Sequence, residues 1–131
     1  MADDRDPMEW LADRIELLLG AFTLVKTFLS ELPLPIEVPD LEGEEGAANP
    51  DAPLALWRAY SLMDDEPMHE TLREAHKGLI VQWFTAYEMA NLIRLAGPME
   101  WRMVALDAAI HHLGVTVQLI ESTDLLDDDE S

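Results

Sequence analysis

Histidine and carboxylate side chains at helical spacing are the groups in this sequence best suited to chemistry. Glu66 and His69 are three positions apart, and Asp107 and His111 are four apart, so each pair would share one face of a helix. Together with His76 they could bind zinc or a di-iron centre between helices. A di-iron bundle needs a second Glu-x-x-His pair and two further glutamates, which the other helical segments do not supply. We therefore predict no metal and no cofactor, with His76 and His111 at the edge of an apolar core.

The residue pattern supports no other class of catalytic site. Cysteine is absent, which excludes disulfides, thiolate nucleophiles and cysteine-ligated metals. The six glycines form neither a Gly-x-Gly-x-x-Gly fingerprint nor a phosphate-binding loop, and no serine lies in a nucleophile elbow. Adjacent carboxylates such as Asp64 and Asp65 fall in polar turns, which suit solvation better than acid–base catalysis. The sequence predicts that the protein is not an enzyme.

Charge is the most unusual feature of the composition. The 131 residues include 27 Asp and Glu but 8 Lys and Arg, which gives a net charge of −19. Residues 32–52 and 121–131 each hold six acids and no base, so these two short segments carry nearly half of all the acids. Such a surface disfavours direct binding to nucleic acid or to an anionic membrane, because both require cationic side chains.

Three interpretations of this acidity stay open. Acidic loops and tails keep many proteins solvated, and adaptation to high salt also enriches Asp and Glu. Alternatively, the chain is an acidic inhibitor or nucleic-acid mimic, of viral origin for example, that blocks the basic nucleic-acid-binding surface of a host or defence protein. The acids assigned to contact such a basic partner are Glu42, Glu44, Glu45, Asp127, Asp128 and Asp129.

Neither a targeting signal nor a membrane span is predicted. The start of the chain is acidic, whereas a secretory signal begins with a basic segment. The stretch taken as most apolar, Leu17 to Val25, is far shorter than the roughly 20 residues that cross a bilayer. The length fits one domain. We expect a single α-helical domain over residues 1–131 in a soluble, cytoplasmic protein.

Apolar residues recur at alternating intervals of four and three, which predicts an all-α bundle of three long helices and one short helix. The first helix begins at Pro7 behind the cap Asp6 and ends at Pro33. A short helix runs from 51 or 53 to about 63, a third from about 67 to 96 and a fourth from about 98 to 122. The inward seam of the third helix is Leu72, His76, Leu79, Trp83, Ala86, Ala90 and Ile93, and that of the fourth is Met99, Met103, Leu106, Ile110, Leu113, Val117 and Ile120.

An acidic, proline-rich linker is predicted over residues 33–53, and an irregular acidic tail over residues 123–131. At the start of the linker, Leu32, Leu34, Ile36 and Val38 alternate with other residues. Extended chain places alternate residues on one side, so we expect this stretch to lie as an apolar strap against the bundle.

The first helix carries more apolar surface than one seam requires. Beside the seam runs a second stripe, formed by Trp10, Leu17, Ala21, Leu24 and Phe28, so the helix is either central in its bundle or shared with another chain. Gly114 inside the fourth helix could mark a close helix crossing. We predict a non-enzymatic protein-interaction or assembly factor that acts through helix packing and self-associates as a homo-oligomer. The residues assigned to its interface are Leu11, Ile15, Leu18, Phe22, Trp10, Trp83 and Trp101.

Overall fold

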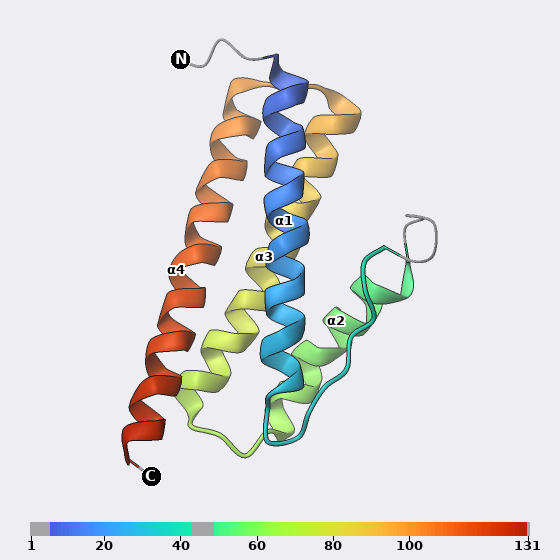
Figure 1. Ribbon diagram of the computed structural model, residues 1–131. Coiled ribbons are helices and arrows are strands. Elements are labelled where there is room, and N and C mark those ends of the chain that lie inside the picture. The colour runs from blue at the N-terminus through green and yellow to red at the C-terminus, as the bar shows by residue number, and fades with distance from the viewer. Residues whose placement is uncertain (1–5, 43–48, 131) are drawn as a thin grey trace.

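Four α-helices and a proline-rich connection make up the chain (Figure 1). The computed structural model describes the backbone of residues 6–42 and 49–130, and the side chains as far as residue 122. The helices are α1 (Pro7–Ser30), α2 (Asp51–Leu62), α3 (Glu70–Ala96) and α4 (Glu100–Glu130), with a single 3-10 turn, η2, at Met63–Asp65. The prediction of an all-α bundle is confirmed, and no strand occurs over 6–42 or 49–130.

Helix α3 is the central element of this arrangement. It packs against both α1 and α4, whereas α1 and α4 make little direct contact with each other. Figure 1 shows α1 and α4 side by side in front of α3, with α2 and the linker beside the C-terminal half of α1. Helices α1 and α4 therefore both pack on α3. On the side away from α3, no described helix fills the space between α1 and α4.

The helix ends follow the predicted capping chemistry only in part. At α1, the Asp6 carboxylate accepts a hydrogen bond from the Met8 N–H at 2.8 Å, as the sequence predicted. Helix α3 begins three residues later than predicted, because His69 is its cap and accepts from the Thr71 N–H through Nδ1 at 3.1 Å. The prediction that α4 ends near Ser122 is wrong, since its backbone stays helical to Glu130 and no glycine or proline interrupts it there.

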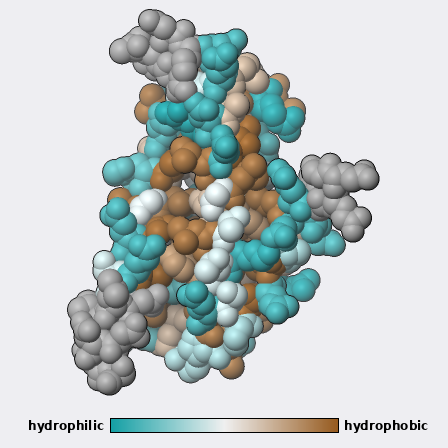
Figure 2. Space-filling model, in the orientation of Figure 1, coloured by the Kyte–Doolittle hydropathy of each residue, from teal (hydrophilic) through white to brown (hydrophobic). Residues whose placement is uncertain are grey.

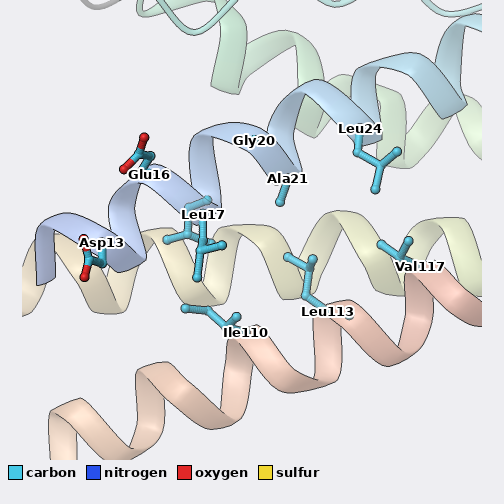
Figure 3. Close-up of a pocket in the computed structure, with 11 residues that line it drawn as sticks. Asp13, Glu16, Leu17, Gly20, Ala21, Leu24, Ile110, Leu113 and Val117 are labelled. Carbon is cyan, nitrogen blue, oxygen red and sulfur yellow. The ribbon is translucent and has the colours of Figure 1, made fainter. Parts of the chain in front are cut away.

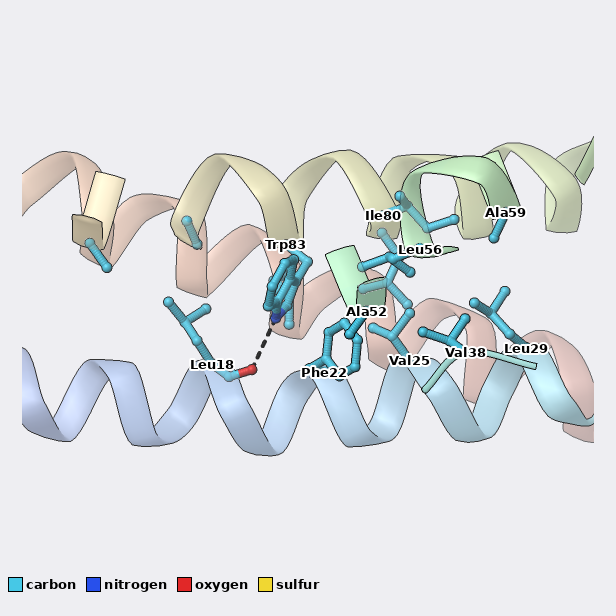
Figure 4. Close-up of a cluster of buried hydrophobic side chains, with 14 of the residues drawn as sticks. Leu18, Phe22, Val25, Leu29, Val38, Ala52, Leu56, Ala59, Ile80 and Trp83 are labelled. Atoms are coloured by element: carbon cyan, nitrogen blue, oxygen red, sulfur yellow. Dashed lines mark hydrogen bonds between the residues drawn. The ribbon is translucent and has the colours of Figure 1, made fainter. Parts of the chain in front are cut away.

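Trp83 of α3 is the centre of the buried core (Figure 4). Its indole N–H donates a hydrogen bond to the Leu18 carbonyl oxygen of α1 at 2.9 Å. Its ring stacks on Tyr87, with centroids 4.7 Å apart, and lies 5.0 Å from the ring of Phe22. All seven residues of the predicted α3 seam are buried, so the four-three periodicity located this core correctly.

The start of the linker lies against the bundle as the predicted apolar strap, but one of its four alternating residues, Leu34, is exposed. Leu32, Ile36 and Val38 are buried, whereas Leu34 is 52% exposed. The chain from Glu31 to Leu34 forms a turn, so strict alternation begins only at Pro35. The Ile36 N–H donates to the Leu29 carbonyl at 2.9 Å, and the Lys26 ammonium pairs with Asp40. These bonds fasten the linker to α1.

A buried carboxylate joins the linker to the start of α3. Glu66 is buried, and its Oε1 accepts a hydrogen bond from the Leu34 N–H at 3.0 Å. Arg73 donates through Nη2 to the carbonyl oxygens of Glu66 and Met68, at 2.8 and 3.1 Å. The Glu66 side chain is thus bonded to the linker, and its backbone carbonyl is bonded to Arg73 of α3.

An ion pair connects α3 to η2. The Lys77 ammonium lies 2.8 Å from an Asp64 carboxylate oxygen and 4.7 Å from the centre of the Tyr60 ring. The hydrogen bond to Asp64 favours the charged ammonium and raises the pKa of Lys77 above its usual 10.5. This pair helps to orient the short α2–η2 segment on α3.

Replacing Trp83 by phenylalanine tests the α1–α3 contact. Trp83→Phe keeps a ring in the core but removes the donor to the Leu18 carbonyl. We expect a loss of about 1–3 kcal/mol in the free energy of unfolding, measured by urea denaturation. The exposed Trp101 provides the matched control, and Trp101→Phe should change stability by less than about 0.5 kcal/mol. Equal losses in the two variants would contradict this account of the core.

Replacing Glu66 tests the connection between the linker and α3. Glu66→Ala removes the acceptor for the Leu34 N–H, and we expect a loss of about 1–2 kcal/mol in unfolding free energy. Glu66→Gln keeps an acceptor oxygen of similar reach and should lose less. If glutamine and alanine are equally destabilising, the hydrogen bond to Leu34 contributes nothing.

Candidate functional site

An apolar groove runs between α1 and α4, on the face that carries no further helix (Figure 3). Its volume is about 800 Å³. Leu17, Ala21 and Leu24 of α1 point toward α4, and Ile110, Leu113 and Val117 of α4 point back toward α1. Figure 2 shows the same region as a hollowed brown patch bordered by hydrophilic residues.

The two walls follow directly from helical spacing. Positions 17, 21 and 24 are separated by four and three residues, and positions 110, 113 and 117 by three and four. Each set therefore forms one stripe along its helix. The neighbouring stripe of α1, which includes the buried Leu18 and Phe22, is occupied by α3. The groove is what remains when α3 holds both helices and no described residue covers the second stripe of α1 and the facing side of the α4 seam.

Two glycines lie on opposite walls of the groove. Gly20 and Gly114 both sit inside long helices, where glycine costs about 1 kcal/mol relative to alanine. A Cβ built at either position meets nothing within 4 Å. The described residues therefore form no close helix crossing at Gly114. The open space beside both glycines faces the groove.

Carboxylates border the groove on its α1 side. Asp13 and Glu16 are among the lining residues, and none of the lining residues is lysine or arginine. Near one end of the groove, Nε of Arg14 on α1 lies 3.1 Å from Oδ1 of Asp107 on α4. The guanidinium carbon of Arg14 lies 4.5 Å from the centre of the Trp10 ring. Arg14 is therefore engaged by its own chain, and the rim keeps a negative charge.

A second, smaller hollow lies on the other side of α1. Its volume is about 540 Å³, and it shares Glu16 and Gly20 with the main groove. Its other wall comes from the linker, which contributes Leu41 and the exposed Glu42. Glu42 belongs to the acids assigned from sequence to a basic partner. The structure thus places one predicted acidic residue on this second hollow, across α1 from the apolar groove.

Helix α4 is apolar on its outward face as well. Trp101, which is 64% exposed, and Val104, Val115 and Leu119 are large exposed apolar residues on this helix. Between Met103 and Ile120 the only charged residue is Asp107, which Arg14 pairs. In a chain with a net charge of −19, this is a charge-poor surface.

Helix α4 is long and apolar enough to cross a membrane by length and composition. An 18-residue window within Glu100–Ser122 has a mean hydropathy of 1.4, and 22% of that window is buried inside the structure. It is the one helix with these properties in the part of the chain that the structure describes. Leu17–Val25 is a shorter apolar stretch than this window of α4.

The interface residues predicted from sequence are mostly internal. Leu11, Leu18, Phe22, Trp10 and Trp83 are buried within the chain, Ile15 is half-buried and Trp101 is exposed. The five buried side chains belong to the core around α3. A second copy of the chain could contact them only if the helices separated. The second α1 stripe, by contrast, places Leu17, Ala21 and Leu24 on the groove wall, and only Trp10 of that stripe is buried.

The other acids assigned to a basic partner lie outside the part of the chain whose side chains the structure describes. Glu44 and Glu45 lie outside the described residues, and Asp127, Asp128 and Asp129 belong to the last turns of α4, whose side chains are not described. Their assignment to a basic partner stays a prediction.

The histidines and carboxylates considered for a metal site lie apart. No three His, Asp or Glu side chains gather in a metal-binding arrangement among the described residues. Nδ1 of His76 forms a hydrogen bond with the Leu72 carbonyl oxygen at 2.9 Å, and Asp107 forms an ion pair with Arg14. His69 caps α3 through Nδ1. Each of these groups has a structural role in the helices.

Comparison of the chain with protein-family models, with curated proteins and with solved structures finds no match.

Alanine at the two groove glycines tests whether the fold needs them. We expect Gly20→Ala and Gly114→Ala each to raise the free energy of unfolding by about 1 kcal/mol, because the new methyl group meets open space and the helix gains propensity. Gly97 is the contrasting position, since its φ of 113° disfavours any side chain, and Gly97→Ala should lower stability. Thermal unfolding of the three variants measures this. Destabilisation at position 20 or 114 would show that the chain itself fills the groove.

Proposed function

We propose that the chain is a non-enzymatic protein-interaction factor that binds a partner by helix packing in the groove between α1 and α4. The observation that carries the proposal is the open apolar groove of about 800 Å³ with Leu17, Ala21 and Leu24 on one wall. Burial of apolar surface is the main source of affinity between proteins. An uncovered apolar depression of this size on a highly charged chain is a candidate interaction site.

The chemistry of the walls favours binding over catalysis. They consist of aliphatic side chains and helix backbone, and their two carboxylates, Asp13 and Glu16, lie on exposed positions. Sites for small polar ligands usually place a few polar groups within an apolar cavity to orient the ligand. Here the floor, at Leu18 and Leu113, is apolar. A surface of this kind recognises another apolar surface.

The charge-poor face of α4 extends this surface. Val115, for example, is exposed one position after Gly114, which lines the groove. A partner seated in the groove would thus meet further apolar side chains outside it. Trp101 lies on the same helix, and tryptophan is enriched at protein interfaces.

Site-specific photocrosslinking tests this function. A photoreactive benzophenone side chain replaces Leu17, which is 59% exposed on the groove wall, or Leu54, which is 65% exposed on α2 away from the groove. Irradiation in lysate from the source cells should give a discrete heavier protein adduct from position 17 and none from position 54. An adduct of twice the mass of the chain supports self-association through the same groove. Equal labelling at both positions, or no adduct at position 17, rejects the groove as an interaction site.

A further inference from the structure

We propose that the groove binds a basic amphipathic α-helix from another protein, an inference that rests on the function proposed above. Three features carry it: the length and spacing of the two walls, the glycine on each wall, and the negative charge along the rim.

The walls have the dimensions of a helix-binding site. Leu17 to Leu24 and Ile110 to Val117 each span seven positions, which is about 10 Å of helix at 1.5 Å per residue. Both walls thus offer two turns of aliphatic side chains. Ridges of one helix pack into grooves of this kind, and an occupant would use apolar anchors at i, i+3 or i+4, and i+7.

The glycines favour a helix over a bulkier or more irregular occupant. Gly20 lies between Leu17 and Leu24, and Gly114 lies between Ile110 and Val117, so each is near the middle of its wall. Open space surrounds both positions. Small residues at the centre of a helical contact allow the backbones to approach closely.

The rim selects a cationic occupant. Glu16 borders the groove and the neighbouring hollow, and Glu42 borders that hollow from the linker. Neither forms an ion pair with a cation within the described part of the chain. With a net charge of −19, the chain attracts a basic helix over a long range and repels a second copy of itself. Charge complementarity therefore points to a foreign basic partner.

A pair of designed peptides tests this inference. Each is a helical peptide of about 14 residues, roughly 20 Å long, with one leucine stripe. One carries lysine beside the stripe, and the other carries glutamate at the same positions. Fluorescence anisotropy measures binding to the full chain. At low salt, we expect the lysine peptide to bind at least about tenfold more tightly than the glutamate peptide. This ratio of affinities should shrink as the salt concentration rises.

Variants that fill the groove locate the binding site. Gly20→Leu and Gly114→Leu place a side chain in the open space of the groove. Each should lower the affinity for the lysine peptide by about tenfold or more. Gly78→Leu is the matched control, because Gly78 lies in α3 with equally open space and does not line the groove. It should bind like the original chain. Thermal unfolding verifies that all three variants are folded.

Neutral substitutions on the rim test the role of charge. The double variant Glu16→Gln with Glu42→Gln should reduce the preference for lysine over glutamate by about threefold or more, without changing the fold. Glu88→Gln, an exposed acid on α3, removes a charge away from the groove and serves as control. If Glu88→Gln has the same effect, only the overall charge attracts the peptide.

Other occupants give distinct results that overturn the inference. Equal binding of both peptides contradicts a basic helix. Self-association of the chain in sedimentation that Gly114→Leu abolishes identifies a second copy instead, and binding to neutral lipid vesicles that the same variant abolishes identifies a membrane. If crosslinking at position 17 yields a protein adduct but the lysine peptide does not bind, the interaction function stands and the basic helix is wrong. If both fail, the proposed function fails with it.

Discussion

The hydrogen bond from the Trp83 indole to the Leu18 carbonyl fixes how the long helices lie. It is buried and joins the middle of α3 to the middle of α1. Sliding or rotating α1 along α3 would leave the N–H without a partner in an apolar core, which costs about 1–3 kcal/mol. The rings of Phe22 and Tyr87 both contact the indole. Because Leu18 is also part of the groove floor, this bond determines which stripe of α1 remains uncovered.

Helix α4 is attached to the same support by different contacts. Leu106, Leu113 and Ile120 are buried within the core, and Thr116 donates a hydrogen bond to Gln82 of α3 at 2.7 Å. The ion pair of Arg14 and Asp107 bridges α1 and α4 near one end of the groove. The groove is therefore a consequence of two helices held independently by α3. Its walls are set by core contacts, and an occupant need not build them.

The sequence predicted the helices well because their periodicity reports burial directly. It could not tell which second stripe would find a partner inside the chain. Trp10 and Trp101 both end the tetrapeptide Pro-Met-Glu-Trp, yet the first is buried and the second is exposed, since only tertiary packing separates them. Ile110 and Val117 were assigned to the core seam and are half-buried groove residues. The local signals of the groove were the second α1 stripe with Leu17, Ala21 and Leu24, and the two glycines inside good helices, Gly20 and Gly114.

The acidity of the chain and its apolar groove gain a common interpretation under the proposed function. Apolar contact alone binds many partners, because the hydrophobic effect is non-directional. Glu16 at the edge of the groove and Glu42 on the neighbouring hollow add a penalty for acidic helices and an attraction for basic ones. The charge-poor face of α4 lets a partner approach closely without burying unpaired carboxylates, which would be costly. In this interpretation the groove supplies affinity, and the distribution of acids decides which helix can use it.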